Sequence, residues 1–112
     1  MTSIVEPGTL IHPSVKLSHY VRVGRGCIIG ENVTLKSGVI LAERTVIMPD
    51  CRIGRHVIVG ACSLVRESIP DDSGIWVGVP CRPLKKVQSI SKEKIGYGAE
   101  TELTLEINRI GQ

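Results

Sequence analysis

A repeat of six residues runs without insertion from Val5 to Pro70 and limits what this chain can fold into. Eleven consecutive hexads begin with an aliphatic residue: Val5, Ile11, Leu17, Val23, Ile29, Leu35, Leu41, Ile47, Ile53, Val59 and Val65. The fifth residue is Thr, Val, Cys or Ser in all but the last hexad, where it is the larger Ile69: Thr9, Val15, Val21, Cys27, Val33, Val39, Thr45, Cys51, Val57 and Ser63. Repetition of this length at a fixed period predicts stacked structural repeats.

The period itself indicates the shape of each repeat. An amphipathic helix would space its apolar residues by three and four, and a half-buried strand would space them by two. A large residue at the first position and a small one at the fifth indicates a short flat side followed by a corner. One such side cannot bury its apolar face alone, so the pattern predicts copies stacked above and below it.

This pattern resembles that of the hexapeptide-repeat acyltransferases, in which three hexads make one triangular coil. The resemblance implies an all-β fold, a single-stranded left-handed parallel β-helix, although parallel crossovers are usually right-handed. Eighteen residues per coil then predict three inner stacks. They are Val5, Val23, Leu41 and Val59; Ile11, Ile29, Ile47 and Val65; and Leu17, Leu35 and Ile53.

The domain organisation follows from where the resemblance stops. We expect a β-helix domain over residues 1–86 and a short C-terminal extension over 87–112. Within the extension, residues 101–110 alternate between apolar and polar side chains, which predicts a half-buried strand. At 112 residues, with one Trp, two Tyr and no Phe, the chain is a single small domain with an aliphatic core.

Charge and cysteine usage exclude several classes of protein. A net charge of +3 without an arginine-rich run argues against nucleic-acid binding. The chain has neither a long apolar segment nor the form of a signal peptide at its start, so we expect a soluble, cytoplasmic protein. Its four cysteines include no CxxC pair, so neither zinc nor a disulfide framework is indicated.

The segment from Ile53 to Lys86, IGRHVIVGACSLVRESIPDDSGIWVGVPCRPLKK, resembles the C-terminal signature of the same family. In that family the signature holds acetyl-CoA, and cations contact its phosphates. The resemblance therefore implies a set of cofactor-binding residues: Gly60, Ala61, Ser63, Arg66, Trp76, Gly78, Pro80, Arg82 and Lys85. Glu67 stands where the family often has a lysine. Two roles are open for Trp76: it stacks on the adenine of the cofactor, or it covers the end of the β-helix.

Three histidines are candidates for a catalytic base. His19, in LSHYVRVG, resembles the I-x-H-x-x-V-I-G element of sugar N-acetyltransferases, where the histidine is the base. Arg22 replaces an apolar residue of that element, and the family's usual position, counted from the C-terminal signature, falls one hexad earlier, at Pro13. His12 and His56 are the alternatives.

A metal site is a further possibility that the histidines raise. His56 lies 37 residues after His19, close to two coils, as in the γ-class carbonic anhydrases of this fold. That class needs an additional H-x4-H pair, which the three histidines here do not supply. A catalytic metal needs about three protein ligands, so we expect no metal.

Taken with the resemblance, these features predict an acetyl-CoA-dependent O- or N-acetyltransferase. The family implies a homotrimer with sites between subunits, and a sugar or nucleotide sugar as the small-molecule acceptor. The hexads from Ile29 to Arg52 continue without the long loop that galactoside and serine acetyltransferases carry there. That absence, the register of His19 and the Glu67 substitution favour the alternative, a non-catalytic trimeric β-helix that serves as a scaffold or binds a ligand.

Overall fold

The computed structural model describes residues 2–84, which form short strands separated by tight corners and no helix. The first eleven strands have two residues each, and the last two are longer. They are β1 (Ile4–Val5), β2 (Leu10–Ile11), β3 (Lys16–Leu17), β4 (Arg22–Val23), β5 (Ile28–Ile29), β6 (Thr34–Leu35), β7 (Ile40–Leu41), β8 (Val46–Ile47), β9 (Arg52–Ile53), β10 (Ile58–Val59), β11 (Leu64–Val65), β12 (Ile75–Gly78) and β13 (Cys81–Pro83).

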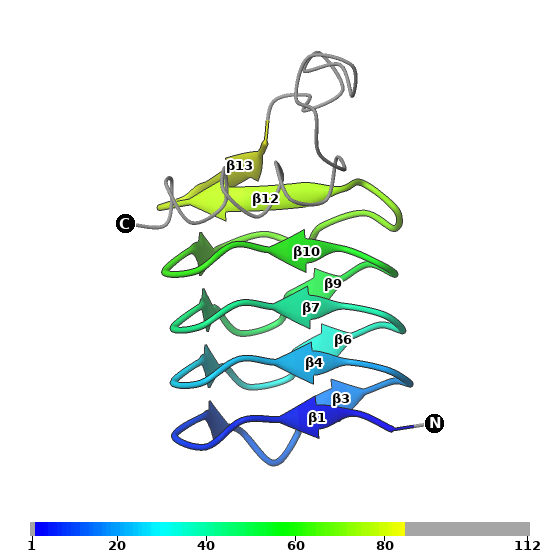
Figure 1. The fold of residues 1–112 in the computed structure, drawn as a ribbon, viewed down its shortest axis with the longest axis vertical. Helices are drawn as coiled ribbons and strands as arrows, with labels where there is room; N and C mark the ends of the chain where they lie inside the picture. Colours follow the sequence, from blue (N-terminus) through cyan, green and yellow to red (C-terminus); the bar gives the residue numbers. More distant parts are fainter. Residues whose placement is uncertain (1, 85–112) are drawn as a thin grey trace, which may run out of the picture.

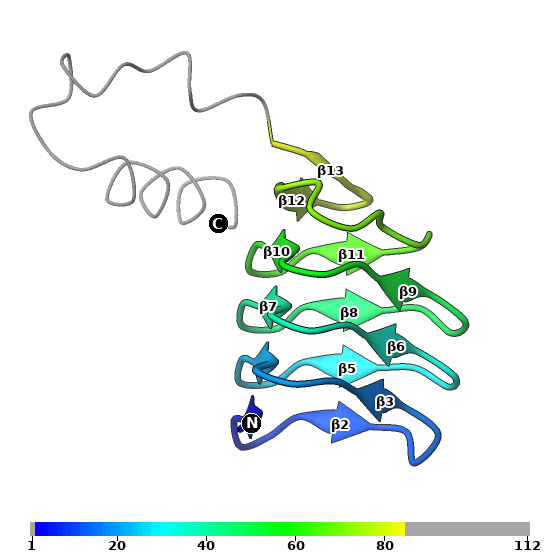
Figure 2. The ribbon, with the colours of Figure 1, turned by 90° about the vertical axis from the view of Figure 1, so that its right-hand side faces the viewer.

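The strands stack into three parallel sheets that form the sides of a triangular coil (Figures 1 and 2). Side A contains β1, β4, β7, β10 and β12, with β13 added antiparallel; side B contains β2, β5, β8 and β11; side C contains β3, β6 and β9. In Figure 1 the chain crosses the front from right to left along side A, returns behind along side C, and climbs from the N-terminus. This is a left-handed coil, as the resemblance implied.

The strand register confirms the three predicted stacks. Val5 aligns with Val23 and Leu41 on side A, and the same interval of eighteen residues holds on sides B and C. Large first-position residues of the second and third coils, such as Leu35 and Ile53, are fully buried. In the first coil Leu17 is 38% exposed, because no described residue stacks beneath it.

The corners fall at the third and fourth positions of each hexad, and the fourth residue turns the chain. Several of these residues have a positive φ, among them Tyr20, Asn32 and His56 at about 60°. Asn tolerates this region better than most side chains, and Gly best. The corner after side A is called the AB corner here, the one after side B the BC corner, and the one after side C the CA corner.

The last coil departs from the predicted hexad. Ile69 aligns with Ile53, only 16 residues back, and Ile75 aligns with Ile58, 17 residues back. Ile69 therefore takes an inward first-position place, where the sequence pattern put it at the fifth position. Side chains complete the altered ladder, since the Arg52 N–H donates to Ser68 Oγ at 2.9 Å.

The end of the coil is closed by β12 and β13, which form a hairpin over the core. Trp76 aligns above Val59 and packs against the buried cluster, so it covers the end of the β-helix. Lys85, the predicted extension 87–112 and its strand at 101–110 lie outside the described residues. Within residues 2–84, no helix is long and apolar enough to cross a membrane.

Candidate functional site

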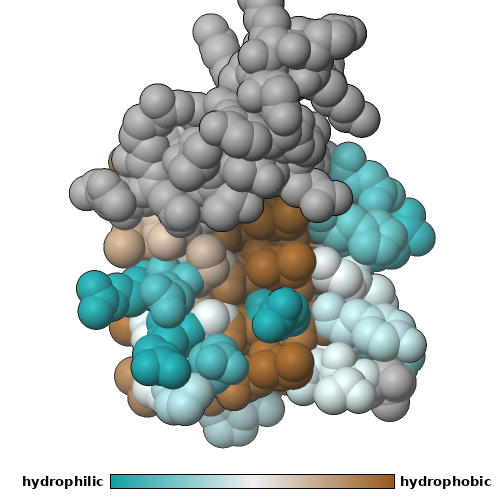
Figure 3. All heavy atoms as spheres, viewed as in Figure 1, coloured by the Kyte–Doolittle hydropathy of each residue, from teal (hydrophilic) through white to brown (hydrophobic). Residues whose placement is uncertain are grey.

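The three sides of the coil present different surfaces. Outward residues on side A are mainly isoleucine and those on side B are aliphatic: Ile4, Ile40, Ile58 and Ile75, then Leu10, Ile28, Val46 and Leu64. Figure 3 shows the side-A residues as an apolar strip between two hydrophilic corners. Arg22 interrupts this strip, between Ile4 and Ile40. On side C the same positions hold Lys16, Thr34 and Arg52.

A groove of about 380 Å³ runs beside the apolar strip of side A, near the AB corner. Small residues, Gly24 and Ala42, line it, and Ala61 lies at its upper end. A Cβ on Gly24 would come within 2.8 Å of the backbone carbon of Ala42, so this position keeps successive coils close. Glu6 and Glu43 also line the groove. The groove is therefore open to a narrow ligand that contacts main chain.

The predicted cofactor residues of the final coil lie in two environments. Ala61 lines the groove, and Gly60, which is buried, continues the small-residue column above Ala42. The Ser63 side chain is buried, and its Oγ accepts a hydrogen bond from the Gly78 N–H at 3.1 Å. The fifth position of the hexad predicted that Ser63 faces inward, but not that its hydroxyl ties β12 to the coil.

A second hollow, of about 60 Å³, lies at the C-terminal end of the coil. It brings together four of the predicted cofactor residues: Arg66, Trp76, Pro80 and Arg82. Arg66 and Arg82 are both exposed, and Glu67 lines the same hollow. The two guanidinium groups make this hollow a place where an anionic group can bind.

The side chains at this end are held by local hydrogen bonds. Trp76 Nε1 donates to Ser73 Oγ at 3.1 Å, which orients the indole over the core. Arg82 donates from Nη1 to the Cys81 carbonyl oxygen at 3.1 Å. Gly78, with φ of 105°, leads into the turn that contains Pro80. The ring that covers the core thus also forms part of the wall of the hollow.

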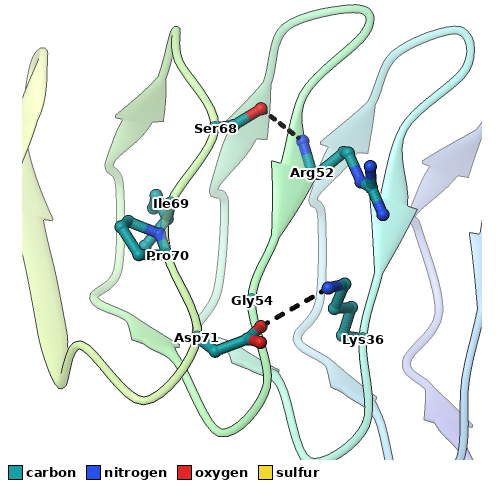
Figure 4. A pocket seen from close by; sticks show the side chains of 7 residues that line it. All are labelled: Lys36, Arg52, Gly54, Ser68, Ile69, Pro70 and Asp71. Atoms are coloured by element: carbon teal, nitrogen blue, oxygen red, sulfur yellow. Dashed lines mark hydrogen bonds and ion pairs between the residues drawn. The ribbon is translucent and has the colours of Figure 1, made fainter.

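A third hollow, of about 280 Å³, lies on side C and was not predicted (Figure 4). Lys36 and Asp71 point toward one another there, with Nζ and Oδ1 3.6 Å apart. The Arg55 backbone N–H donates to Asp71 Oδ1, and this hydrogen bond, with help from the Lys36 and Arg55 charges, lowers the pKa of that carboxyl. Arg52 also lines this hollow. In the sequence, the basic residues at the outward positions of side C were the feature that could have pointed to this hollow.

His12 lies at the BC corner and is held by Ser14. The Ser14 N–H donates to His12 Nδ1 at 3.1 Å, and the Ser14 hydroxyl lies 2.7 Å from the same nitrogen. Nδ1 is therefore the acceptor, so in the neutral ring the proton is on Nε2. That nitrogen faces Glu31, whose Oε1 is 4.0 Å away.

His19 lies at the CA corner, as its third position in the hexad predicted for an outward side chain, and it is exposed. Its ring meets the Tyr20 ring edge-on, with centroids 6.4 Å apart. Among residues 2–84 its ring nitrogens have no hydrogen-bond partner. The neighbour that would orient a base is therefore lacking from this part of the chain.

His56 lies at the same CA corner, two coils above His19. Its Nδ1 is 2.8 Å from Asp72 Oδ1. Arg55 Nη2 lies 3.5 Å from Asp72 Oδ2 and 3.5 Å from Asp71 Oδ2. The corner thus carries a histidine with a carboxylate partner, which the sequence pattern missed.

The remaining titratable groups of the described residues form no metal site, and three of the four thiols are buried. Burial raises the pKa of the thiols of Cys27, Cys51 and Cys81 above the ordinary range, whereas Cys62 is exposed at the AB corner. Among the described residues, no three His, Cys, Asp or Glu side chains gather as metal ligands would. All four cysteines are free thiols.

Comparisons with known proteins agree with this architecture. Residues 2–37 match the family model described as bacterial transferase hexapeptide (six repeats). The chain is 29% identical over 79 residues to the galactoside O-acetyltransferase of Lactococcus lactis, covering 70% of this chain and 38% of that protein. It is 39% identical over 89 residues to the UDP-3-O-acylglucosamine N-acyltransferase of Methylorubrum populi, covering 74% of this chain and 25% of that protein.

A solved structure extends the likeness to three dimensions. AntD, an N-acyltransferase from Bacillus cereus, superposes with a TM-score of 0.66 at 25% identity, covering 84% of this chain and 67% of that one. By contrast, the chain spans well under half the length of either sequence relative. Because the repeat, the left-handed coil and these matches agree, we conclude that the chain is built from the repeat that the bacterial transferase hexapeptide model describes.

Proposed function

We propose that this chain binds acetyl-CoA and transfers the acetyl group to a hydroxyl or amine of a small acceptor. The observation that carries the proposal is the hollow at the C-terminal end, where Arg66, Trp76, Pro80 and Arg82 come together. Arginine suits the phosphates of CoA because its planar fork makes paired hydrogen bonds. The relatives support this reading, since AntD has been solved with coenzyme A and the lactococcal protein is an O-acetyltransferase.

The groove on side A supplies the second part of the proposed cofactor site. Its small residues, Gly24, Ala42 and Ala61, leave room for a narrow chain against the backbone. The pantetheine arm of CoA is such a chain, with amides that can pair with main-chain groups. Glu67 adds a negative charge to the upper hollow, so we expect Arg82 to make the larger contribution to phosphate binding.

The proposed assembly is a homotrimer with sites between subunits. The apolar ladders of sides A and B support it, because Ile28 and Ile40 are 46% and 37% exposed in the single chain. Two neighbouring copies that cover these ladders would remove that surface from water. Side C, with Lys16 and Arg52 outward, would remain in solvent. A ligand in the side-A groove would then lie between subunits.

The proposed acceptor is a sugar or a nucleotide sugar, and the proposed location is the cytoplasm.

A histidine on the CA corner would remove the acceptor's proton, because the ordinary pKa of histidine lies near neutral pH. The sequence motif assigns this role to His19. Its exposure leaves it accessible to an acceptor, and His56 lies on the same corner.

Acetyl-CoA binding to the purified oligomer, measured by calorimetry with CoA alongside, tests the proposal. We expect micromolar binding, and Arg82→Ala should weaken it about tenfold or more, since a hydrogen bond to a charged group contributes roughly 1.5–3 kcal/mol. Arg52→Ala removes another exposed arginine, on side C, and should leave binding unchanged. Wild-type protein that fails to bind at millimolar acetyl-CoA would contradict the proposal and favour the non-catalytic scaffold.

A further inference from the structure

We propose that His56, held by Asp72, is the group that accepts the proton of the attacking acceptor, in place of the motif histidine His19. This inference rests on the proposed acetyl transfer and assigns its proton to one nitrogen. It comes from a contact between His56 and Asp72, which are separated by 16 positions in the sequence. The distance between His56 Nδ1 and Asp72 Oδ1 is 2.8 Å.

The contact fixes the form of the imidazole ring. An ionised carboxylate can only accept hydrogen bonds, so His56 Nδ1 keeps its hydrogen and donates a hydrogen bond to Asp72 Oδ1. In the neutral ring the lone pair then lies on Nε2. Within residues 2–84, no hydrogen bond occupies that nitrogen, and His56 is exposed. His56 Nε2 is therefore free to accept a proton from a bound molecule.

The other two histidines lack this arrangement. The proton of neutral His12 is on Nε2, because its Nδ1 accepts the Ser14 N–H. His12 therefore presents a donor toward Glu31 and cannot act as a base through that nitrogen. His19 has an aromatic neighbour, Tyr20, and no carboxylate contact in the described part of the chain. Only His56 combines a fixed tautomer with an open acceptor nitrogen.

The corner beneath His56 also holds its ring in place. A Cβ added to Gly38 would lie 2.5 Å from His56 Cδ2, so the ring rests directly over that glycine. Arg55 Nη2 lies 3.5 Å from Oδ2, the second oxygen of Asp72. The arginine therefore contacts the same carboxylate that holds the His56 ring. Asp72 is a positioning residue in this scheme, and His56 is the residue that would touch the acceptor.

In the proposed step one bond forms, one bond breaks and one proton passes from the acceptor to CoA through His56. The acceptor oxygen or nitrogen forms a bond to the thioester carbonyl carbon while its proton moves to His56 Nε2. The bond between that carbon and the CoA sulfur then breaks. The imidazolium returns its proton to the departing thiolate, so the products are the acetylated acceptor, free CoA thiol and neutral His56. Asp72 keeps its charge throughout and stabilises the intermediate cation.

Release of CoA thiol from acetyl-CoA, measured with the full-length oligomer, tests the assignment. The probe acceptors are water, methyl β-galactoside and dTDP-4-amino-4,6-dideoxyglucose, the sugar nucleotide bound in the AntD structure. His56→Asn keeps an amide near Asp72 but lacks Nε2, and should lower kcat by about 10²-fold or more. Acetyl-CoA binding, measured by calorimetry on the same sample, should persist.

The Asp72→Asn variant distinguishes a role of Asp72 in positioning the His56 ring from a role in folding alone. The new amide can donate to His56 Nδ1, which would move the ring proton to Nε2 and remove the base. We expect kcat to fall with little change in KM for acetyl-CoA. Ring-nitrogen NMR should show His56 changing from the Nδ1–H to the Nε2–H form, a change that a purely structural role would not produce.

Two glycines provide a matched pair of variants. Gly38→Ala places a methyl group against the His56 ring, whereas Gly26→Ala meets only Arg44 Cγ at 3.4 Å. Both positions have a positive φ, of 76° and 71°, so both variants carry similar backbone strain. Gly38→Ala should lower kcat much more than Gly26→Ala does.

Three results would overturn the assignment. The first is full turnover by His56→Asn. The second is a loss of turnover with His19→Asn while His56→Asn stays active. The third is wild-type protein that binds acetyl-CoA but releases CoA no faster than His56→Asn with any of the three acceptors. Failure to bind acetyl-CoA at all would instead contradict the proposed function, so the two failures are distinguishable.

Discussion

The regular coils and the last coil are both joined by backbone hydrogen bonds, but they differ in spacing and in ion contacts. From β1 to β11, aliphatic residues stack at intervals of eighteen and backbone hydrogen bonds join each coil to the next. In the last coil the interval shortens, and side-chain oxygens of Ser68 and Asp71 accept backbone N–H groups. Four of the five ion contacts among residues 2–84 involve Asp71 or Asp72.

This difference shows where a repeat protein of this kind can place chemistry. A strict repeat puts the same type of contact at every level, so its surface varies mainly through substitutions at outward positions. When the repeat shortens, residues that would have continued a ladder are free to face new partners. Asp72 meets His56 in this way. The hairpin that follows brings Trp76 and Arg82 into one hollow.

Leu35→Ala should have the largest effect on stability, because Leu35 is fully buried in a regular coil. Removing it leaves a cavity that costs about 2–5 kcal/mol. Urea unfolding at fixed protein concentration measures this loss. Leu17→Ala is the matched change one coil below, where the side chain is 38% exposed, and should cost less than half as much. Equal losses would mean that Leu17 is covered in the assembled protein.

Gly54→Ala tests the last coil. A Cβ at Gly54 would collide with the backbone of Pro70 and Asp71, and overpacking of this kind costs about 1–3 kcal/mol. Hydrogen exchange should show the loss of protection confined to the last coil and hairpin. Gly30→Ala, in a regular coil, meets Pro49 N at 2.9 Å and should cost less. A uniform loss of protection in Gly54→Ala would contradict separate stability of the last coil.

Asp71→Asn should have the smallest effect, and one that depends on pH. The pKa of Asp71 is lowered by the Arg55 N–H and the nearby cations. A lowered pKa in the folded state stabilises the protein above the ordinary carboxyl range, and that stabilisation is lost as pH falls through the folded value. The Tm difference between wild type and Asp71→Asn should therefore be present at neutral pH and vanish on acidification.

Asp50→Asn serves as the control for that experiment, because it removes the same charge from the BC corner. It should lower Tm less than Asp71→Asn at neutral pH, since Asp50 contacts only the Asn32 amide among the described residues. A Tm difference for Asp71→Asn that persists unchanged at acid pH would contradict the electrostatic account.

Most of the fold could be predicted because the repeat is local and strict. The first-position residues from Val5 to Val65 identified the three stacks, and the observed register agrees. The prediction failed at Ile69, which the hexad count placed at a fifth position. The last coil aligns its residues at intervals of 16 and 17, although its backbone still bonds to the coil below, as from the Gly54 N–H to the Ile69 carbonyl. A six-residue pattern does not contain that information.

The candidate site was predicted only in part. The C-terminal signature singled out Arg66, Trp76 and Arg82, which line one hollow. The pair of His56 and Asp72 was missed because the shortened coil alone brings the two corners into register.

By itself, the sequence determined the period, the inward residues and the aliphatic core, since each hexad must bury its own first and fifth positions. The same period places the outward residues, which are mainly aliphatic on sides A and B and mainly basic on side C, but only the tertiary structure decided which hollows form between them. It also decided which histidine has a carboxylate beside it. A hydrogen bond between coils depends on the length of the turn that connects them, and a single residue gained or lost there changes every partner above it.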